Sequence, residues 1–335
     1  MSIKTICIYG AGALGGAIAA KLASQPGNDI TISVVARGAH LDAIRDNGLS
    51  LREADAERTL NVRLNATDDP KTLPPQDLVI TGLKGHQLAP AAEGIAGLLK
   101  DRTRVVMILN GIPWWYFHRD TRSGHPELQF DELDPEGRLW RLIAPQRVIG
   151  CVAYQGAEVI NPGEIRLSNK GRFVLGEPSG EMSSDLEAIA ALLIGAGLSI
   201  TTTPDIRDEI WSKLMGNAAF NPISALTRAV MTDIMADPAL SAMVGKVMNE
   251  VRAVGEALGA RFNITVEQRL EQSRHVGAAV RTSMLQDLIG GKALEITPLV
   301  GMLAALGRLT AVPTPVSETI LALVTQLDRE NRRGS

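Results

Sequence analysis

The chain has 335 residues, more than the roughly 250 to 300 that one hydrophobic core usually serves, so about two domains are expected. With 45% apolar residues, 21% charged residues and a mean hydropathy of +0.07, the composition argues against a disordered or fibrous chain. The 34 basic and 37 acidic side chains give a net charge of −3, which lacks the basic footprint of a nucleic-acid binder.

The cysteines and the apolar runs indicate in which cellular compartment the protein is found. Cys7 and Cys151 lie in apolar, strand-like runs and cannot build a disulfide scaffold, so a reducing, cytoplasmic location is expected. The longest apolar run, Ala188–Ile200, is shorter than the roughly 18 residues of a membrane span, so no membrane partner is expected. A secretion signal ending near Ala19 is an alternative, but four glycines interrupt that stretch.

Strands and helices alternate over the first part of the chain. Residues 3–9 predict a buried strand, and Leu14–Ser24 predicts the helix that follows it. Further strands are predicted at Ile30–Ala36, Asp77–Leu83 and Thr103–Leu109, with a helix at Leu88–Leu99. This alternation predicts a Rossmann-type, doubly wound parallel sheet with helices on both faces.

The pattern changes twice further along. From about Arg147 to Thr203 the runs are shorter, and we expect a partly antiparallel edge of the same sheet. At Pro204 a proline followed by acidic residues favours a helix start. Helical stretches then follow at Ile206–Leu226, Leu240–Leu258, Val266–Val280, Glu295–Leu309 and Val316–Glu330. The fold class is therefore α/β plus all-α, with an α/β domain over residues 1–204 and a helical domain over residues 205–335.

The segment Pro113–Pro145 fits neither pattern. It holds three of the four tryptophans, Trp114, Trp115 and Trp140, and it interrupts the strand-helix rhythm. A loop of this length is usually functional, so it could form a lid or face a substrate. Alternatively, it is a surface excursion whose aromatic side chains pack on the sheet.

A glycine-rich motif links the first strand to the first helix. It reads Gly10-Ala11-Gly12-Ala13-Leu14-Gly15-Gly16 and contains G-x-G-x-x-G. In that context the glycines permit a tight turn, a close approach of the backbone to a pyrophosphate, and close packing of the helix on the strand. The motif predicts a dinucleotide site.

Arg37 follows the second strand, where an NAD site typically has an acidic residue for the ribose hydroxyls. A guanidinium suits the 2′-phosphate of NADP(H), so NADP(H) is the expected cofactor. The alternative is a solvated loop arginine. Lys84 and Asn110 stand at the carboxyl ends of the next two strands, where open α/β sheets bind ligands, and they are further site candidates.

A polar stripe marks the first helix of the second half. Lys213, Asn217 and Asn221 are spaced at i, i+4 and i+8, and so lie on one face. Asparagine is a poor residue inside a helix, which indicates a stripe that faces something polar, although a structural role in capping nearby backbone is the alternative. Pro222 is expected to kink or end the helix.

Other chemistries lack their motifs. The five histidines show no zinc-ligand spacing, so no metal site is expected. The chain also has no G-x-S-x-G nucleophile elbow and no G-x-x-x-x-G-K-[ST] phosphate loop.

Taken together, these motifs resemble the ketopantoate reductase (2-dehydropantoate 2-reductase) family over nearly the whole chain. The resemblance rests on the glycine motif, Arg37, Lys84 in LKGHQ, Asn110 in LNGI, the Lys-x-x-x-Asn-x-x-x-Asn-Pro stripe, and SMLQD followed by Glu295. It implies NADPH-dependent reduction of a small 2-oxo acid, in particular 2-dehydropantoate to (R)-pantoate in pantothenate biosynthesis.

The resemblance also implies roles for individual residues. Lys213 matches the general acid and Glu295 its carboxylate partner, while Asn110 and Lys84 lie near nicotinamide and substrate. Asn217, Asn221 and Ser283 match substrate contacts. A lysine suits this reduction, because an ammonium can stabilise and protonate the alkoxide left by hydride transfer.

Departures from the family pattern concern the substrate pocket. The family usually has Asn three residues before the matched Ser283, where this chain has Val280, and often reads T-E-I-D where this chain reads Leu294-Glu295-Ile296-Thr297. The Pro113–Pro145 segment is also longer than the family's usual connection. These differences predict conserved chemistry and an altered pocket.

Two alternatives remain open at this stage. A 3-hydroxy acid dehydrogenase shares the Rossmann half and a helical lysine, and a non-catalytic NADPH-sensing protein would need only the glycine loop and Arg37. A homodimer is compatible with the apolar stripes of the later helices, but those stripes could equally be core.

Overall fold

The computed structural model describes residues 3–25, 27, 29–53, 59–275 and 281–333. It divides into two compact units. We call the first the sheet unit; it comprises Met1–Leu109, Trp114–Arg119 and Glu127–Ile206. The second, the helical unit, comprises Arg207–Ser335 together with two short upstream pieces, Asn110–Pro113 and Asp120–Pro126.

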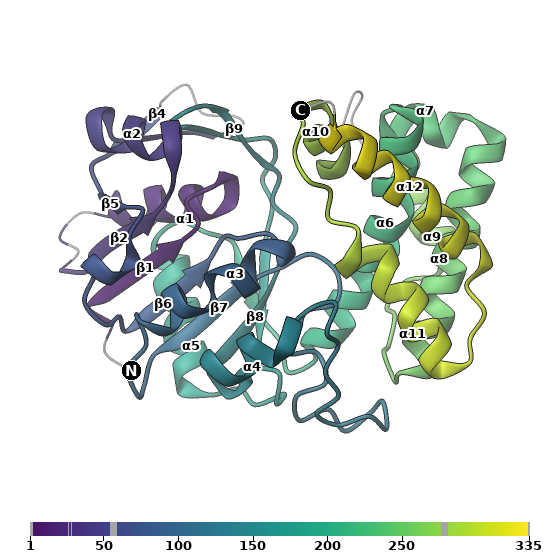
Figure 1. Ribbon diagram of the computed structural model, residues 1–335, viewed down its shortest axis with the longest axis horizontal. Helices are drawn as coiled ribbons and strands as arrows, with labels where there is room; N and C mark the ends of the chain where they lie inside the picture. The colour runs from purple at the N-terminus through teal and green to yellow at the C-terminus, as the bar shows by residue number, and fades with distance from the viewer. Residues whose placement is uncertain (1–2, 26, 28, 54–58, 276–280, 334–335) are drawn as a thin grey trace. The chain divides into compact units, whose positions relative to one another are not determined.

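An eight-stranded sheet forms the centre of the sheet unit, with the order β12-β11-β8-β7-β6-β1-β2-β5. Figure 1 shows β2, β1, β6, β7 and β8 following one another across the unit. Its strands are β1 (Thr5–Tyr9), β2 (Thr31–Val35), β5 (Asn65–Thr67), β6 (Leu78–Thr81), β7 (Arg104–Ile108), β8 (Val148–Ala153), β11 (Phe173–Gly176) and β12 (Ile200–Thr202). Pairing is parallel except between β8 and β11. The predicted Rossmann-type sheet is confirmed, and its inner strands are apolar because both faces are covered.

A second, four-stranded sheet corrects the prediction for the region after Arg147. Its order is β4-β3-β10-β9, with strands β3 (Leu49–Arg52), β4 (Thr59–Val62), β9 (Ala157–Asn161) and β10 (Glu164–Leu167). Only β8, β11 and β12 extend the main sheet; the hairpin β9-β10 pairs instead with β3. This small sheet covers helix α1 (Ala13–Ala23), and a Cβ at Gly16 would collide with Ile165 of β10.

The aromatic part of the Pro113–Pro145 segment is core rather than lid. Trp114, Trp115, Tyr116 and Phe117 are all buried, so the packing alternative is the correct one for these four residues. Edge-to-face contact between Trp114 and Trp140 joins the start of the segment to helix α4 near its end. The other helices of the sheet unit are α2 (Gly38–Asn47), α3 (Gly85–Ala96), α4 (Arg138–Leu142) and α5 (Ser184–Gly195), with 3₁₀ turns at Pro70–Thr72, Pro135–Gly137 and Pro145–Arg147.

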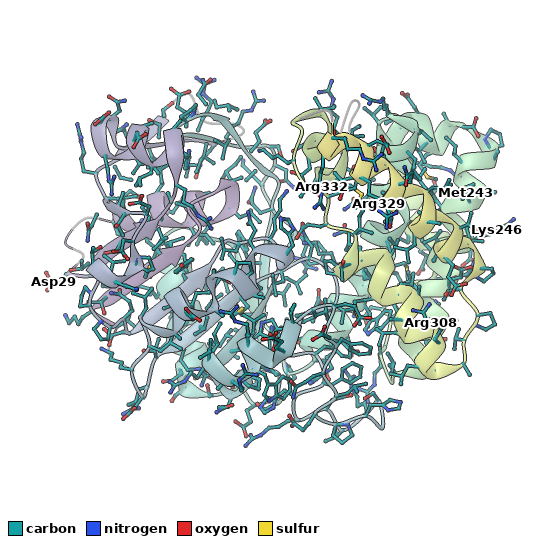
Figure 2. All side chains as sticks on the ribbon, in the orientation of Figure 1. Asp29, Met243, Lys246, Arg308, Arg329 and Arg332 are labelled. Carbon is teal, nitrogen blue, oxygen red and sulfur yellow. The ribbon has the colours of Figure 1, made fainter. Side chains whose placement is uncertain are left out.

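The helical unit is built from seven described helices and one π-helical turn. They are α6 (Ile206–Thr227), α7 (Met231–Ala236), α8 (Pro238–Ala257), α9 (Val266–Arg274), α10 (Ser283–Ile289), the turn Thr297–Gly301, α11 (Met302–Thr310) and α12 (Pro315–Arg333). Lys246 on α8 projects into solvent (Figure 2). Among the residues that the structure describes, no helix is both long and apolar enough to span a bilayer.

The predicted helix Ile206–Leu226 is confirmed, and it does not end at Pro222: α6 continues to Thr227, because buried residues after the proline, such as Ile223 and Ala225, hold the last turns in the core. Two other helix predictions need correction. Glu295 precedes the π-helical turn rather than opening a regular helix. Helix α9 stops at Arg274, and the end of the predicted Val266–Val280 helix lies outside the described residues.

Ion pairs within the helical unit fix the start of α6. Arg122 Nη2 lies 3.0 Å from Asp208 Oδ1, and Arg207 Nε lies 3.6 Å from Asp120 Oδ1. Asp120 and Arg207 are both buried, and Asp120 also accepts the backbone N–H of Arg122 at 3.2 Å. The upstream piece Asp120–Pro126 is therefore an integral part of this unit.

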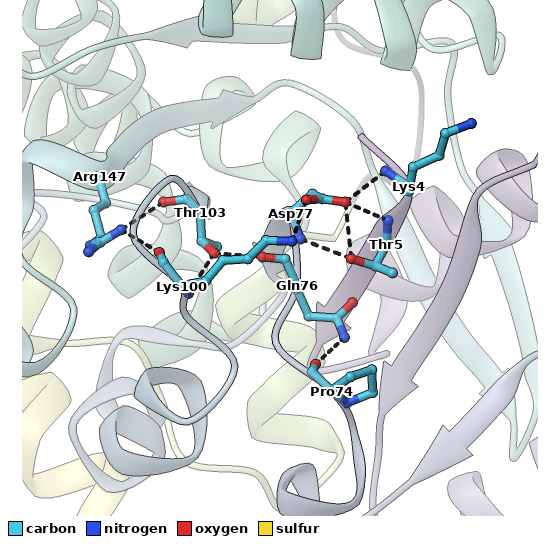
Figure 3. Close-up of polar contacts among 8 residues, drawn as sticks. All are labelled: Lys4, Thr5, Pro74, Gln76, Asp77, Lys100, Thr103 and Arg147. Carbon is cyan, nitrogen blue, oxygen red and sulfur yellow. Dashed lines mark hydrogen bonds and ion pairs between the residues drawn. The ribbon is translucent and has the colours of Figure 1, made fainter. Parts of the chain in front are cut away.

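A carboxylate organises the amino ends of the central strands (Figure 3). Asp77 Oδ2 accepts the N–H groups of Lys4 at 2.8 Å and Thr5 at 3.0 Å, and Oδ1 lies 2.6 Å from Lys100 Nζ. Burial opposes ionisation of this carboxyl, but the bonds from Lys100, Lys4 and Thr5 outweigh it and lower the pKa of Asp77 to about 2.

We expect Asp77→Asn to lower the free energy of unfolding by about 1–3 kcal/mol at neutral pH. Because the folded pKa of about 2 lies below the ordinary 3.8, the unfolded state binds more protons between those values. The difference in free energy of unfolding between wild type and Asp77→Asn should therefore be complete above about pH 4 and disappear as the pH falls towards 2. Denaturant titrations at several pH values measure this, with the exposed Asp101→Asn as the matched control. An equal advantage at pH 2.5 and pH 6 would contradict the assignment.

Candidate functional site

The glycine loop between β1 and α1 forms the first part of the site. Gly10 has a φ of +94°, and the N–H groups of Gly10 and Ala11 both donate to Val35 O, at 3.0 and 3.1 Å. No side chain caps α1 at Gly12, and the first turn of a helix has no internal acceptors for its N–H groups. The loop therefore presents the N-terminus of α1, including Ala13 and Leu14, to an anion.

Three glycines of this region have different physical tasks. A Cβ at Gly15 would collide with Gly10 O, so Gly15 permits the close approach of α1 to the loop. Gly82, which follows β6, would place a Cβ 2.9 Å from Gly15 Cα. A Cβ at Gly12, by contrast, meets nothing within 4 Å, so the protein itself does not require glycine there. Open space beside an uncapped helix end fits a bound pyrophosphate.

This contrast gives a prediction. Gly12→Ala should fold with an unchanged melting temperature but raise the dinucleotide Kd about tenfold or more, because its methyl group occupies the approach of the phosphates. Gly15→Ala should instead cost about 1–3 kcal/mol of stability through overpacking. Thermal melts and titrations with NADPH separate the two effects. Equal loss of stability in both variants would remove the special role of Gly12.

A cavity of about 200 Å³ lies beside the loop. It is lined by Tyr9, Gly10, Ala11, Gly12, Val35, Ala36, Arg37, His40, Gly82, Leu83 and Gln87. These residues include one guanidinium, that of Arg37, and no carboxylate. Burial raises the pKa of the Tyr9 phenol against the opposing pull of Arg37. The cavity suits an anionic ligand that extends from the glycine loop.

Sequence reasoning missed Tyr9, His40 and Gln87 in this cavity. His40 lies three residues after Arg37, and this spacing places both residues near the start of α2. That spacing could have indicated that His40 shares a site with Arg37. Lys84 is the N-cap residue of α3 and donates its backbone N–H to Gln87 Oε1 at 3.0 Å. Its neighbours line the cavity, but Lys84 is not among the lining residues.

A lysine, an amide and a carboxylate meet within the helical unit. Lys213 Nζ of α6 donates to Asn110 Oδ1 at 2.7 Å, and Asn110 Nδ2 donates to Glu295 Oε2 at 3.1 Å. Glu295 is buried and Lys213 is half-buried. The two bonds fix the orientation of the Asn110 amide, because its oxygen faces an ammonium and its nitrogen faces a carboxylate. We call this chain of contacts the Lys213–Asn110–Glu295 relay.

The turn after β7 is shaped to hold Asn110 in place. Gly111 has a φ of +74°, and a Cβ there would collide with Pro298 O of the π-helical turn. Ile112 N donates to the same oxygen at 2.8 Å. π-Helical turns often accompany functional sites, and this one provides the acceptor that anchors the Asn-Gly turn.

The remaining predicted contacts are only partly brought together. Asn221 is buried and lies at the hydrogen-bond limit, 3.5 Å, from Ser283 Oγ at the start of α10. Asn217 is half-buried, one turn before Asn221 on α6. Val280, where the family usually has Asn, lies outside the described residues.

A Rossmann-type sheet with an uncapped glycine loop, continued by a helical unit that holds a lysine relay, defines a dinucleotide-dependent oxidoreductase. Comparison with known proteins specifies the family. The model described as "Ketopantoate reductase PanE/ApbA" matches residues 6–180, and its C-terminal counterpart matches residues 205–328. The chain belongs to the ketopantoate reductase family.

Individual relatives agree with this assignment. A 2-dehydropantoate 2-reductase of Mesorhizobium japonicum is 48% identical and covers 96% of this chain and 97% of its own length. A structure from Ralstonia solanacearum, provisionally called a ketopantoate reductase, is 39% identical, with a TM-score of 0.91 over 98% of this chain and 99% of that one. D-mandelate dehydrogenase, at 21% identity and a TM-score of 0.82 over 98% and 99% of the two chains, shows the same fold. The chain is thus an oxidoreductase with a nicotinamide dinucleotide as cofactor.

Proposed function

We propose that this chain catalyses the NADPH-dependent reduction of a small 2-oxo acid, with 2-dehydropantoate as substrate and (R)-pantoate as product, in pantothenate biosynthesis. The observation that carries the proposal is the Lys213–Asn110–Glu295 relay, in which the proton donor Lys213 is hydrogen-bonded to the Asn110 amide and Glu295 holds that amide in turn. The substrate of the Mesorhizobium japonicum relative supports the choice of 2-oxo acid. Cys7 and Cys151 are both buried and are not joined in a disulfide, which supports a cytoplasmic location.

The glycine loop and Arg37 would hold the cofactor. The first-turn N–H groups of α1 suit the pyrophosphate, and the Arg37 guanidinium suits a 2′-phosphate, which favours NADP(H) over NAD(H). Lys84 is proposed to act near the same ligand. When bound, the cofactor supplies a hydride to C2 of the oxo acid.

Lys213 is proposed as the general acid. As the carbonyl becomes an alkoxide, the Lys213 ammonium stabilises the developing charge and transfers one proton to the oxygen. Asn110 keeps the ammonium oriented, and the buried carboxylate of Glu295 holds the amide in turn. The proposed substrate contacts are Asn217, Asn221 and Ser283. The reaction consumes one NADPH and one proton for each 2-hydroxy acid formed.

The test is NADPH oxidation with a panel of oxo acids: 2-dehydropantoate, 2-oxoisovalerate, phenylglyoxylate and a 3-oxo acid. We expect the highest kcat/KM with 2-dehydropantoate, (R)-pantoate by chiral chromatography, and deuterium at C2 when the cofactor is labelled. Preference for another 2-oxo acid would correct the substrate but keep the chemistry. Turnover of the 3-oxo acid alone would favour a 3-hydroxy acid dehydrogenase, and NADPH binding without turnover of any member would refute the catalytic proposal.

A further inference from the structure

His40, in the first turn of α2, connects the glycine loop to the hairpin β9-β10. Its Nε2 lies 2.8 Å from Ala11 O, and its Nδ1 lies 3.0 Å from the backbone nitrogen of Gly163. A backbone N–H can only donate and a carbonyl oxygen can only accept. The ring therefore accepts at Nδ1 and donates from Nε2, which is the neutral Nε2–H tautomer.

The bond to Ala11 O determines the direction of a neighbouring N–H. The carbonyl of Ala11 and the N–H of Gly12 belong to one peptide group, which is planar and trans, so they point in opposite directions. Holding the carbonyl towards His40 thus aims the Gly12 N–H away from it. A Cβ at Gly12 would meet no atom within 4 Å and no side chain caps the helix there, so the bond from His40 is the side-chain contact that holds this peptide plane.

The imidazole is itself held from its other side. Gly163 forms the turn of the hairpin with a φ of +78°, and its carbonyl accepts the N–H of Ser50 at 2.8 Å. A Cβ at Gly163 would lie 3.1 Å from Ala43 Cβ of α2, so the turn is closely packed on the helix that carries His40. The small sheet therefore holds the ring through the turn at Gly163, which packs on α2.

We propose that His40 is a positioning residue that fixes the Ala11–Gly12 peptide, so that the Gly12 N–H is preset to receive the pyrophosphate of the dinucleotide. This inference rests on the proposed cofactor site. It assigns to the hairpin β9-β10, through Gly163, an indirect part in cofactor affinity.

Two substitutions separate the two hydrogen bonds. His40→Gln can place an amide N–H near the position of Nε2 and keep the bond to Ala11 O. His40→Asn can place its oxygen near the position of Nδ1 and keep the bond from Gly163, but it is too short to reach Ala11 O. Each variant is titrated with NADP⁺ and with adenosine 2′-monophosphate, which lacks the pyrophosphate, and a thermal melt confirms that it is folded.

We expect His40→Asn to raise the Kd for NADP⁺ about three- to tenfold, the effect of losing one well-placed hydrogen bond. Its Kd for adenosine 2′-monophosphate should stay within about twofold of wild type, because that ligand makes no use of the Gly12 N–H. His40→Gln should bind NADP⁺ like wild type. In turnover assays, His40→Asn should raise the KM for NADPH and leave kcat nearly unchanged.

Unchanged NADP⁺ binding by His40→Asn would overturn the inference, as would equal weakening of both ligands in both variants, which indicates a general structural role. In either case wild-type binding would leave the proposed function standing. A wild-type protein that binds adenosine 2′-monophosphate and NADP⁺ equally weakly would overturn the pyrophosphate site, and the proposed function with it.

Discussion

Replacing Lys213 by alanine should lower kcat with 2-dehydropantoate about 100- to 10,000-fold, the range that a positioned general acid typically contributes. The Kd for NADPH should stay within about twofold of wild type, because the glycine loop and Arg37 are unchanged. Stopped-flow NADPH oxidation and fluorescence titration measure the two quantities. Added methylammonium should restore part of the lost rate by supplying an ammonium where the Lys213 side chain is missing.

The matched control for this substitution is Lys246→Ala, which removes the same charge from an exposed position on α8. It should retain wild-type kcat, KM and melting temperature. A Lys213→Ala protein with kcat within about threefold of wild type would remove Lys213 from its proposed role. Loss of activity with no rescue and a lower melting temperature would point to a structural role instead.

Replacing Arg37 by alanine should weaken NADPH binding about 10- to 100-fold, since a hydrogen bond to a charged group contributes about 1.5–3 kcal/mol. The Kd for NADH should change less than about threefold, because NADH lacks the 2′-phosphate. The ratio of the two dissociation constants is the measured quantity. It isolates the contact with the 2′-phosphate from any general change in the cavity.

Arg52→Ala is the control for Arg37→Ala, because Arg52 is also exposed and also in the sheet unit but does not line the cavity. It should leave both constants unchanged. Equal weakening of NADPH and NADH by Arg37→Ala would show that the residue supports the fold of the cavity, and no change in either would make Arg37 a solvated residue. Both results would contradict the assignment of NADP(H).

Local patterns predicted the parts of this fold that depend on local contacts. The run from Thr5 to Ala23 contains strand, turn and helix in 19 consecutive residues, and hydrophobic periodicity with glycine spacing identifies it. The small sheet escaped prediction because its central pairing joins Leu51 to Ile165. Such a pairing leaves no local signal in either segment, and both strands are only four residues long.

The contacts of the candidate site also join distant segments and leave no local signal in the sequence. Asn110 and Glu295 are 185 residues apart, and no spacing rule relates them. Their joint appearance in the sequence prediction came from the family resemblance, and the structure adds the contacts. The sequence did not single out His40, because one histidine on a helix has no periodicity and its two hydrogen-bond partners, Ala11 and Gly163, lie in two distant loops.

The piece Asn110–Pro113 belongs to the helical unit although it lies far upstream in the chain. Consequently, a chimera that exchanged only residues 205–335 with a relative would take Lys213 and Glu295 from one parent and Asn110 from the other. The amide, the ammonium and the carboxylate must fit one another to within hydrogen-bond distance. Recombination between such enzymes is therefore constrained at the turn after β7 as well as at the start of α6, and keeping these three residues from one parent requires both segments to move together.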